Sequence, residues 1–355
     1  MKVAPVVRAM RLTSVRPRIV HTGQHYDEQM SEVFFRQLDI PPPDVHLEVG
    51  SGPHGAQTAK ILEGFERELM ADRPQPLGVV VVGDVNSTVA CALAAVKLGI
   101  HVAHIEAGLR SFDRSMPEEI NRVLTDAISD LLFVSEPSGE ENLRSEGIPE
   151  RKIKPVGNVM IDTLVHELPA TRGMNLDRLG INGFSYSLVT LHRPSNVDNR
   201  PMLSLLVEFL CEISYRLPVI FPLHPRTEQR LDEFGLMSRL AACPTVRLLG
   251  PLGYHENLAA MTRARVVITD SGGIQEESSY LGIPCLTLRP NTERPVTVTH
   301  GTNTIIGSDL KRAERLIDDV IEGRYKKGTA IPGWDGHASD RIVSTLLHEW
   351  GACEP

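Results

Sequence analysis

Short runs rich in β-branched residues alternate with amphipathic stretches along the whole 355-residue chain. This alternation is typical of parallel β-sheets covered by helices, and it constrains the fold more than any other feature. The apolar run Val79–Val82 predicts a strand that is buried on both faces. Because 355 residues exceed the usual size of one hydrophobic core, we expect two doubly wound α/β domains that face each other across a cleft.

The strands and helices expected from these patterns fall into two similar halves. In the first half, strands are expected at Arg18–His21, Val79–Val82, Val102–Glu106 and Leu131–Val134, with helices at Gln57–Met70, Ser87–Leu98 and Glu118–Ala127. In the second half, strands are expected at Ser187–Leu191, Val219–Leu223, Val246–Leu249, Val266–Thr269 and Cys285–Leu288, with helices at Met202–Tyr215, Thr227–Phe234, His255–Met261 and Gln275–Tyr280. Patterning is weakest around Leu168–Ser185. The predicted domains are therefore residues 1–168, residues 169–337 and a terminal helix within residues 338–355.

Charge and cysteine content narrow the function classes. The formal net charge of −8 argues against a broad footprint on a phosphate backbone, so nucleic acid is not an expected partner. The five cysteines are scattered without metal-ligand spacing, so we expect no metal site and buried free thiols in a reducing compartment. No basic-then-apolar leader opens the chain, and no apolar run is long enough to span a bilayer. These features predict a cytoplasmic protein with no membrane partner.

The strongest phosphate signal is the segment Thr269–Glu277. A predicted buried strand ends at its first residue, Gly272 and Gly273 allow close backbone approach, and a helix follows. The free N–H groups at such a helix start form an anion site. Ser271 can add a hydroxyl donor, and Glu277 can accept from ribose hydroxyls. An ordinary glycine turn with Ser271 as N-cap explains the pattern about equally well.

Three carboxylates follow strands or open a helix in the first half. Asp84 follows the strand Val79–Val82, Glu106 ends the next strand, and Glu118 opens a helix. If the two strands are neighbours, Asp84 and Glu106 share one sheet edge and supply a base and an acid for inverting a carbon-bound proton. Asp84 is explained equally well as a helix cap, and acids such as Glu118 are common in a first helical turn.

Basic residues also stand at predicted strand ends. His192 and Arg193 follow the strand Ser187–Leu191, where an imidazole can donate to a departing phosphate and a guanidinium can bind a diphosphate. A surface polar pair is the alternative interpretation. Arg294 is a further candidate phosphate contact, and Gln24 and His25 follow the first strand, where a plain turn explains them nearly as well.

Taken in order, these motifs resemble one family. Gly83–Thr88, Ile105–Arg110, Pro117–Arg122, His192-Arg193 and Thr269–Glu277 with Thr292–Pro295 are similar to the successive signatures of the non-hydrolysing UDP-N-acetylglucosamine 2-epimerases. The resemblance implies a glycosyltransferase-B-like fold of two Rossmann-like domains, with UDP held mainly by the second. It implies interconversion of UDP-GlcNAc and UDP-ManNAc by elimination of UDP to 2-acetamidoglucal and re-addition. The resemblance implies no cofactor and no metal, and it implies a homodimer.

The resemblance also implies roles for individual residues. Asp84, Glu106 and Glu118 are the candidate acid/base groups, Arg122 supports them, and His192 assists the leaving UDP. The residues implied to bind the UDP-sugar are Lys2, Arg193, Ser271, Gly272, Gly273, Glu277 and Arg294. Gln24 and His25 match a segment that touches a regulatory UDP-GlcNAc in some bacterial members.

The chain departs from the family pattern in two places that matter for activity. It begins inside the family's first helix, so the first strand of the N-terminal domain is expected to be missing. Val296 follows Pro295 where many members have Glu, which marks a possible subgroup acting on modified sugars such as UDP-2,3-diacetamido-uronic acids. Three alternatives stay open: a UDP-sugar glycosyltransferase of the same fold, a hydrolysing 2-epimerase, and an inactive nucleotide-sugar-binding regulator.

Overall fold

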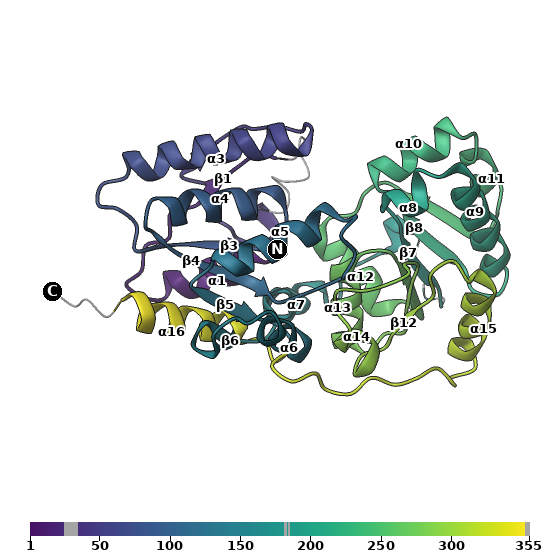
Figure 1. Cartoon of the computed structure of the whole chain (residues 1–355). Helices are drawn as coiled ribbons and strands as arrows, with labels where there is room; N and C mark the ends of the chain where they lie inside the picture. The colour runs from purple at the N-terminus through teal and green to yellow at the C-terminus, as the bar shows by residue number, and fades with distance from the viewer. Residues whose placement is uncertain (25–34, 181–182, 184, 352–355) are drawn as a thin grey trace. The chain divides into compact units, whose positions relative to one another are not determined.

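The computed structural model describes residues 1–24, 35–180, 183 and 185–351 (Figure 1). The chain divides into two compact units. Unit 1 comprises residues 1–166 and 332–355, and unit 2 comprises residues 167–331. Each unit is an α/β structure whose described strands all pair in parallel, as the alternating sequence pattern predicts.

Unit 1 has two separate parallel sheets. One contains β1 and β2, and the other has the order β3-β4-β5-β6. The elements that begin in unit 1 are α1 (Val3–Arg11), β1 (Val20–His21), β2 (Val45–His46), α3 (His54–Ala71), β3 (Gly78–Val82), α4 (Asn86–Lys97), β4 (His101–Ala107), α5 (Pro117–Ile128), β5 (Leu131–Val134), α6 (Pro137–Ser145), the 3-10 turn η1 (Glu150–Lys152), β6 (Ile153–Pro155), α7 (Val159–Thr171) and α16 (Ala338–Trp350).

Helices cover both faces of the larger unit 1 sheet (Figure 1). Because successive side chains of a strand point to opposite faces, Val102 packs with α3 and α4, whereas Ala103 and Ile105 pack with α1 and α16. Strand β3 is only half-buried over most of its length, in contrast to the prediction of a strand buried on both faces. The physical reason is its place at the edge of its sheet, where β4 is its neighbour.

Unit 2 has one six-stranded parallel sheet in the order β12-β11-β10-β7-β8-β9. Counted along the unit, this is the 3-2-1-4-5-6 arrangement of a doubly wound dinucleotide-type fold. Its elements are η2 (Asp177–Leu179), β7 (Ser187–Thr190), α8 (Pro194–Val197), α9 (Arg200–Ser214), β8 (Val219–Pro222), α10 (Pro225–Glu233), α11 (Met237–Ala241), β9 (Val246–Leu249), α12 (Tyr254–Arg263), β10 (Val266–Thr269), α13 (Gly272–Leu281), β11 (Cys285–Thr287), α14 (Val296–Thr299), β12 (Asn303–Ile305) and α15 (Leu310–Ile321).

Local sequence explains where the unit 2 helices begin. Helix α9 has the Asn199 side chain as a cap for the Met202 N–H at 3.1 Å, and α15 has the Asp309 side chain on the Arg312 N–H at 2.9 Å. The apolar faces of both helices pack on β7, β8 and β10 in the largest core cluster of the unit. This packing fixes the central strands that carry the candidate site.

The boundary between the second and third predicted segments differs from the division in the structure. The sequence pattern puts it after His337, whereas unit 1 already begins again at Pro332. Trp334 is the reason, since its indole is buried in unit 1 and donates to the Ser135 carbonyl at 3.0 Å. Helix α16 then packs against α1.

The expectation of free thiols throughout is wrong for two cysteines. Cys211 of α9 and Cys243 form a disulfide, while Cys91 and Cys285 are free and buried. The two paired residues lie 32 positions apart, on segments that the unit 2 core brings together, and spacing alone does not reveal this. Among the described residues, no helix is both long and apolar enough to cross a membrane.

Candidate active site

The carboxyl ends of β7 and β10 meet at the centre of the unit 2 sheet. These strands pair in register from Ser187–Val266 to Thr190–Thr269. The strand order reverses between them, and doubly wound folds bind their ligands at such a switch point. The residues that follow directly are His192 and Arg193 after β7, and Asp270 to Gly273 after β10. Two motifs that are about 80 residues apart in sequence therefore share one sheet edge.

Asp270 organises the β7 side of this edge. Its fully buried carboxylate accepts from the backbone N–H groups of His192 at 3.1 Å and Arg193 at 2.9 Å, and from Nδ2 of Asn196 at 3.0 Å. Burial would raise the pKa of Asp270, but the hydrogen bond and charge of His192 and these further donors hold it below its ordinary value. The network fixes the backbone on which His192 and Arg193 stand.

The contact between Nδ1 of His192 and Asp270 also orients the imidazole ring. Its Nδ1 lies 3.0 Å from Oδ1 of Asp270, and its side chain is 35% exposed. A carboxylate on Nδ1 fixes the tautomer and leaves Nε2 available to a ligand. The neighbouring guanidinium of Arg193 has a buried Nε that no group in the described residues bonds. Arg193 thus retains donor capacity for an anion, and Nε2 of His192 can donate to one when the ring is protonated.

The amino terminus of α13 forms the other side of the edge. Ser271 precedes the helix in extended conformation, and within the described residues its side chain makes no capping hydrogen bond. A Cβ at Gly272 would lie 2.6 Å from Nη1 of Arg294, so only glycine lets that guanidinium lie against the helix start. Arg294 is itself held by Glu276 and Glu293. Helix N–H groups and a guanidinium together make an anion-binding surface.

Glu277, one turn into α13, is buried and bonded to a tyrosine. The Tyr254 hydroxyl donates to its Oε1 at 2.9 Å. Burial raises the pKa of Glu277 to about 7, and the carboxylate of Glu276 adds to that rise while the Tyr254 hydrogen bond opposes it. A carboxyl group of this kind can accept from neutral hydroxyls such as those of a ribose.

In unit 1, Glu106 on β4 has a strained backbone. It has a φ of 71°, and the register of β4 against β5 shifts between Ile105 and Ala107. Non-glycine residues in this region of φ are costly and cluster at functional sites. Lys2 pairs with Oε2 of Glu106, whereas Oε1 is buried and no described residue hydrogen-bonds to it. The chain therefore presents a buried carboxylate oxygen that is left for another partner.

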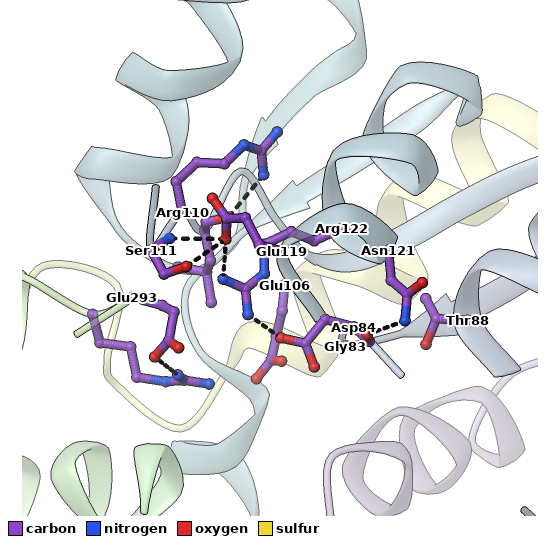
Figure 2. A network of polar contacts seen from close by, with 12 residues as sticks. Gly83, Asp84, Thr88, Glu106, Arg110, Ser111, Glu119, Asn121, Arg122 and Glu293 are labelled. Atoms are coloured by element: carbon purple, nitrogen blue, oxygen red, sulfur yellow. Dashed lines mark hydrogen bonds and ion pairs between the residues drawn. The ribbon is translucent and has the colours of Figure 1, made fainter. Parts of the chain in front are cut away.

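Asp84 stands beside this bulge because β3 and β4 are neighbours. Gly83, which precedes it, donates its N–H to the Ile105 carbonyl at 3.0 Å. The Asp84 carboxylate pairs with Arg122, whose Nη1 donates to Glu119 at 2.6 Å, and its carbonyl accepts from Nδ2 of Asn121 at 3.0 Å. Figure 2 shows Arg122 between Glu119 and Asp84. Helix α5 thus holds Asp84 at two points.

Glu119 is a structural carboxylate. It accepts from the backbone N–H groups of Ser111, which Figure 2 shows, and Phe112, each at 2.9 Å, and so fixes the loop that follows β4. Its neighbour Glu118 is half-buried, and within the described residues it makes no hydrogen bond or ion pair. Helix α5 therefore uses one acid to hold the loop and leaves the other without a partner in the described chain.

Family comparison identifies what this architecture belongs to. A family model described as UDP-N-acetylglucosamine 2-epimerase matches residues 8–347. The chain belongs to this family. The UDP-N-acetylglucosamine 2-epimerase of Methanocaldococcus jannaschii is 43% identical over 98% of this chain and 95% of that protein. The UDP-2,3-diacetamido-2,3-dideoxy-D-glucuronate 2-epimerase of Pseudomonas aeruginosa is 45% identical over 92% of this chain and 90% of that protein.

Solved structures of epimerases in the family agree with the fold. The crystal structure of the M. jannaschii UDP-GlcNAc 2-epimerase in complex with UDP-GlcNAc and UDP superposes with a TM-score of 0.90 at 43% identity, covering 98% of this chain and 96% of that one. The Neisseria meningitidis enzyme bound to UDP-GlcNAc gives 0.87 at 29% identity, with coverage of 98% and 96%. The predicted α/β class with two Rossmann-like domains is confirmed, and the protein is an epimerase.

Within each unit the structure brings together most of the predicted site residues. In unit 1, Lys2 pairs with Glu106 and Arg122 pairs with Asp84, and the two pairs form one set at neighbouring strand ends. Glu118 lies on α5 outside that set. In unit 2, His192, Arg193, Ser271, Gly272, Gly273 and Arg294 follow the two central strands, with Glu277 one turn further along α13. The roles of these residues in epimerisation stay a prediction.

The predicted regulatory pair is only partly described. The Oε1 atom of Gln24 accepts from the Ser87 N–H at 3.0 Å, and its backbone carbonyl accepts from Gln57 at 2.9 Å. Gln24 therefore ties the first strand end to α4, and His25 lies outside the described residues. Within the described ranges, no group of three or more His, Cys, Asp or Glu side chains is placed to hold a metal ion.

Sequence reasoning missed the residues that hold the site in place. Asp270, Glu276 and Tyr254 in unit 2, and Glu119 in unit 1, had no assigned role. Two of them carried a usable signal. Asp270 is an acid directly after a strand of four β-branched residues, and Glu119 is three residues before Arg122 on one helix face. Tyr254 carried none, because its contact joins two consecutive helices, α12 and α13, across 23 residues and the strand between them.

Proposed function

We propose that this epimerase interconverts UDP-GlcNAc and UDP-ManNAc by eliminating UDP to give 2-acetamidoglucal and then re-adding it with C2 inverted. The observation that supports this most is Glu106, a buried carboxylate on a left-handed residue with one oxygen that no described residue bonds. Strain of this kind persists only where the surrounding structure over-determines it, and it is typical of catalytic positions. The two relatives solved with UDP-GlcNAc support the substrate.

In this proposal unit 1 supplies the proton transfers. C2 of an N-acetylhexosamine is not acidic, so its proton is removed only by a base held in place while the bond to UDP breaks. Re-addition with inversion needs an acid on the opposite face of the ring, so more than one carboxylate is required. Asp84, Glu106 and Glu118 are the candidates, with Arg122 positioning Asp84.

Unit 2 supplies the diphosphate site. The N–H groups at Ser271–Gly273 and the Arg294 guanidinium bind the phosphates, and Glu277 accepts from the ribose. Asp270 stabilises a protonated His192, whose Nε2 then donates to the departing phosphate oxygen. Arg193 adds positive charge where the leaving group becomes more negative.

A second substrate is favoured by one specific observation. The P. aeruginosa relative that acts on UDP-2,3-diacetamido-2,3-dideoxy-D-glucuronate is 45% identical to this chain. Position 296, where many family members have Glu, is a buried Val at the start of α14. An apolar residue there removes a negative charge that would repel a uronate carboxylate. The chemistry at C2 is the same for both sugars.

The test is turnover of UDP-GlcNAc in deuterated water, followed by proton and phosphorus NMR. We expect UDP-ManNAc, with deuterium at C2 of the product and of the recovered substrate. Free ManNAc and UDP as the end products would identify a hydrolysing 2-epimerase, and absence of any C2 exchange would contradict the elimination. Comparing kcat/KM for the two UDP-sugars decides between the substrates.

Two further proposals accompany this function. We expect the enzyme to act in the cytoplasm and to form a homodimer, as the sequence resemblance implies. Light scattering of the purified protein tests the second of these proposals.

A further inference from the structure

A fully buried ion pair lies within unit 1 between β4 and α5. His104 on β4 and Asp126 on α5 are 0% and 1% exposed, and Nδ1 of the histidine lies 2.6 Å from Oδ1 of the aspartate. Neither residue belongs to the candidate acid/base groups. Charged pairs at this depth are rarely a source of stability, because desolvation offsets their attraction. The further contacts of His104 and Asp126 indicate a role other than stability.

Each partner holds the backbone beside a candidate catalytic carboxylate. Nε2 of His104 lies 2.8 Å from the carbonyl oxygen of Gly83, the residue before Asp84. Oδ2 of Asp126 accepts from the N–H of Gly108 at 3.0 Å, two residues after Glu106. One side-chain pair therefore connects the turn that carries Asp84 to the turn that carries Glu106.

These contacts require protons on both nitrogens of the His104 ring. A carbonyl oxygen only accepts, so Nε2 must donate to Gly83. Asp126 already accepts from Gly108 and Arg110 on its other oxygen, so its Oδ1 accepts from Nδ1. Both ring nitrogens of His104 are thus hydrogen-bond donors. Burial would raise the pKa of Asp126, but the hydrogen bonds and charges of His104 and Arg110 hold it below its ordinary value.

Arg110 and Glu146 extend the pair into a network. Arg110 follows β4 and lies 2.7 Å from Oδ2 of Asp126, and its guanidinium also contacts Glu146 at the end of α6 at 2.6 Å. Two donor side chains and two carboxylates from four segments therefore form one connected network. Such a network holds a single geometry, because displacing any member leaves a buried charge unpaired.

We infer that His104 is a positioning residue for epimerisation, setting the separation and direction of Asp84 and Glu106 through its two ring N–H groups. This inference rests on the proposed function, since it concerns the two carboxylates assigned there to proton transfer. The positive φ of Glu106 and the bulge beside it support a positioning role. A left-handed glutamate needs neighbours that over-determine its backbone, and the Asp126 bond to Gly108 does so.

Two variants of His104 separate its hydrogen bond to Gly83 from its hydrogen bond to Asp126. In His104→Gln the amide nitrogen reaches the position of Nε2 and keeps the Gly83 bond. In His104→Asn it reaches the position of Nδ1 and keeps the Asp126 bond. We expect each variant to lower kcat by about tenfold to a hundredfold with KM within about threefold, because small misplacements of reacting groups cost this much. His101→Gln on the same strand is the matched control, since that side chain is 63% exposed, and its kcat should be unchanged.

A second readout does not depend on activity. Nitrogen NMR of the wild-type protein labelled in its histidines, recorded at the pH of the epimerase assay, should show one imidazole, absent from the His104→Gln spectrum, with a proton on each ring nitrogen. A ring with one bare nitrogen would overturn the inference, and so would wild-type kcat in both folded variants. Wild-type protein that fails to epimerise either UDP-sugar would instead refute the proposed function. The NMR result alone would then decide whether the His104 ring donates to both Gly83 and Asp126.

Discussion

The predicted site residues of the two units differ in the backbone conformation that carries them. In unit 2 the site follows regular strands of a continuous six-stranded sheet, and the non-glycine residues around it have ordinary backbone angles. In unit 1 the sheet carries a bulge at Glu106, and all four described non-glycine residues with positive φ, including Phe112 in the next loop, belong to this unit. A diphosphate site needs donors that a helix start supplies without strain. A carboxylate aimed at a reacting carbon needs a backbone that departs from the regular strand.

The first prediction tests whether the strained half performs the chemistry. Glu106→Gln, Asp84→Asn and Glu118→Gln should each lower kcat by roughly a hundredfold or more, the usual contribution of a general acid or base. Binding of UDP should change little, because these groups serve the sugar. Asp72→Asn, which breaks a surface pair with Arg18 in the same unit, is the control and should keep wild-type kcat. Near wild-type turnover in all three site variants would refute the mechanism.

The second prediction concerns a glycine that the bulge requires. Gly108 has a φ of 81°, and a Cβ there would lie 2.4 Å from the carbonyl oxygen of Gly139. Backbone cannot yield as a flexible side chain can, so Gly108→Ala should cost about 2–4 kcal/mol in the free energy of unfolding. Gly99→Ala is the matched control, because Gly99 has a φ of 73° with nothing within 4 Å of the added Cβ. Equal losses in urea unfolding would show that φ alone matters.

The two units also differ in how much of their structure could be predicted from the sequence. The regular elements of unit 2 followed from apolar runs and helix signals, and strand β10 was predicted with its observed bounds. The motif Thr269–Glu277 indicated a helix directly after the strand, because a strand, two glycines and a helix are a local pattern, but α13 begins at Gly272 rather than at the predicted Gln275. In unit 1 the sequence located Asp84 and Glu106 at neighbouring strand ends, but it could not reveal the bulge. That geometry depends on Asp126, Glu119 and Arg122, whose contacts span loops and helices.

The third prediction uses the buried carboxyl of unit 2. The pKa of Glu277 is raised from an ordinary value of 4.5 to about 7. Between these values the folded protein binds more protons than the unfolded chain, so stability from this group is present below pH 4.5 and is lost as pH rises through 7. Glu277→Gln should flatten that part of the profile of unfolding free energy against pH, by roughly 3 kcal/mol. An unchanged profile would show that Glu277 does not titrate in this window.

The fourth prediction concerns the unstrained half and has the smallest expected effect. A Cβ at Gly272 would lie 2.6 Å from Nη1 of Arg294, so Gly272→Ala should push the guanidinium from the start of α13. A side-chain end yields more easily than backbone, so the fold should survive with a smaller stability loss than Gly108→Ala. The affinity for UDP should fall by about tenfold, equivalent to about 1.4 kcal/mol, measured by calorimetry. Gly250→Ala in the same unit, with nothing within 4 Å of the new Cβ, should leave UDP binding unchanged. The contrary outcome is that Gly272→Ala destabilises the fold while the UDP affinity of the folded fraction stays normal. That outcome would show that Arg294 serves packing rather than phosphate binding. The contrast between a strained catalytic unit and an unstrained binding unit would then fail at this position.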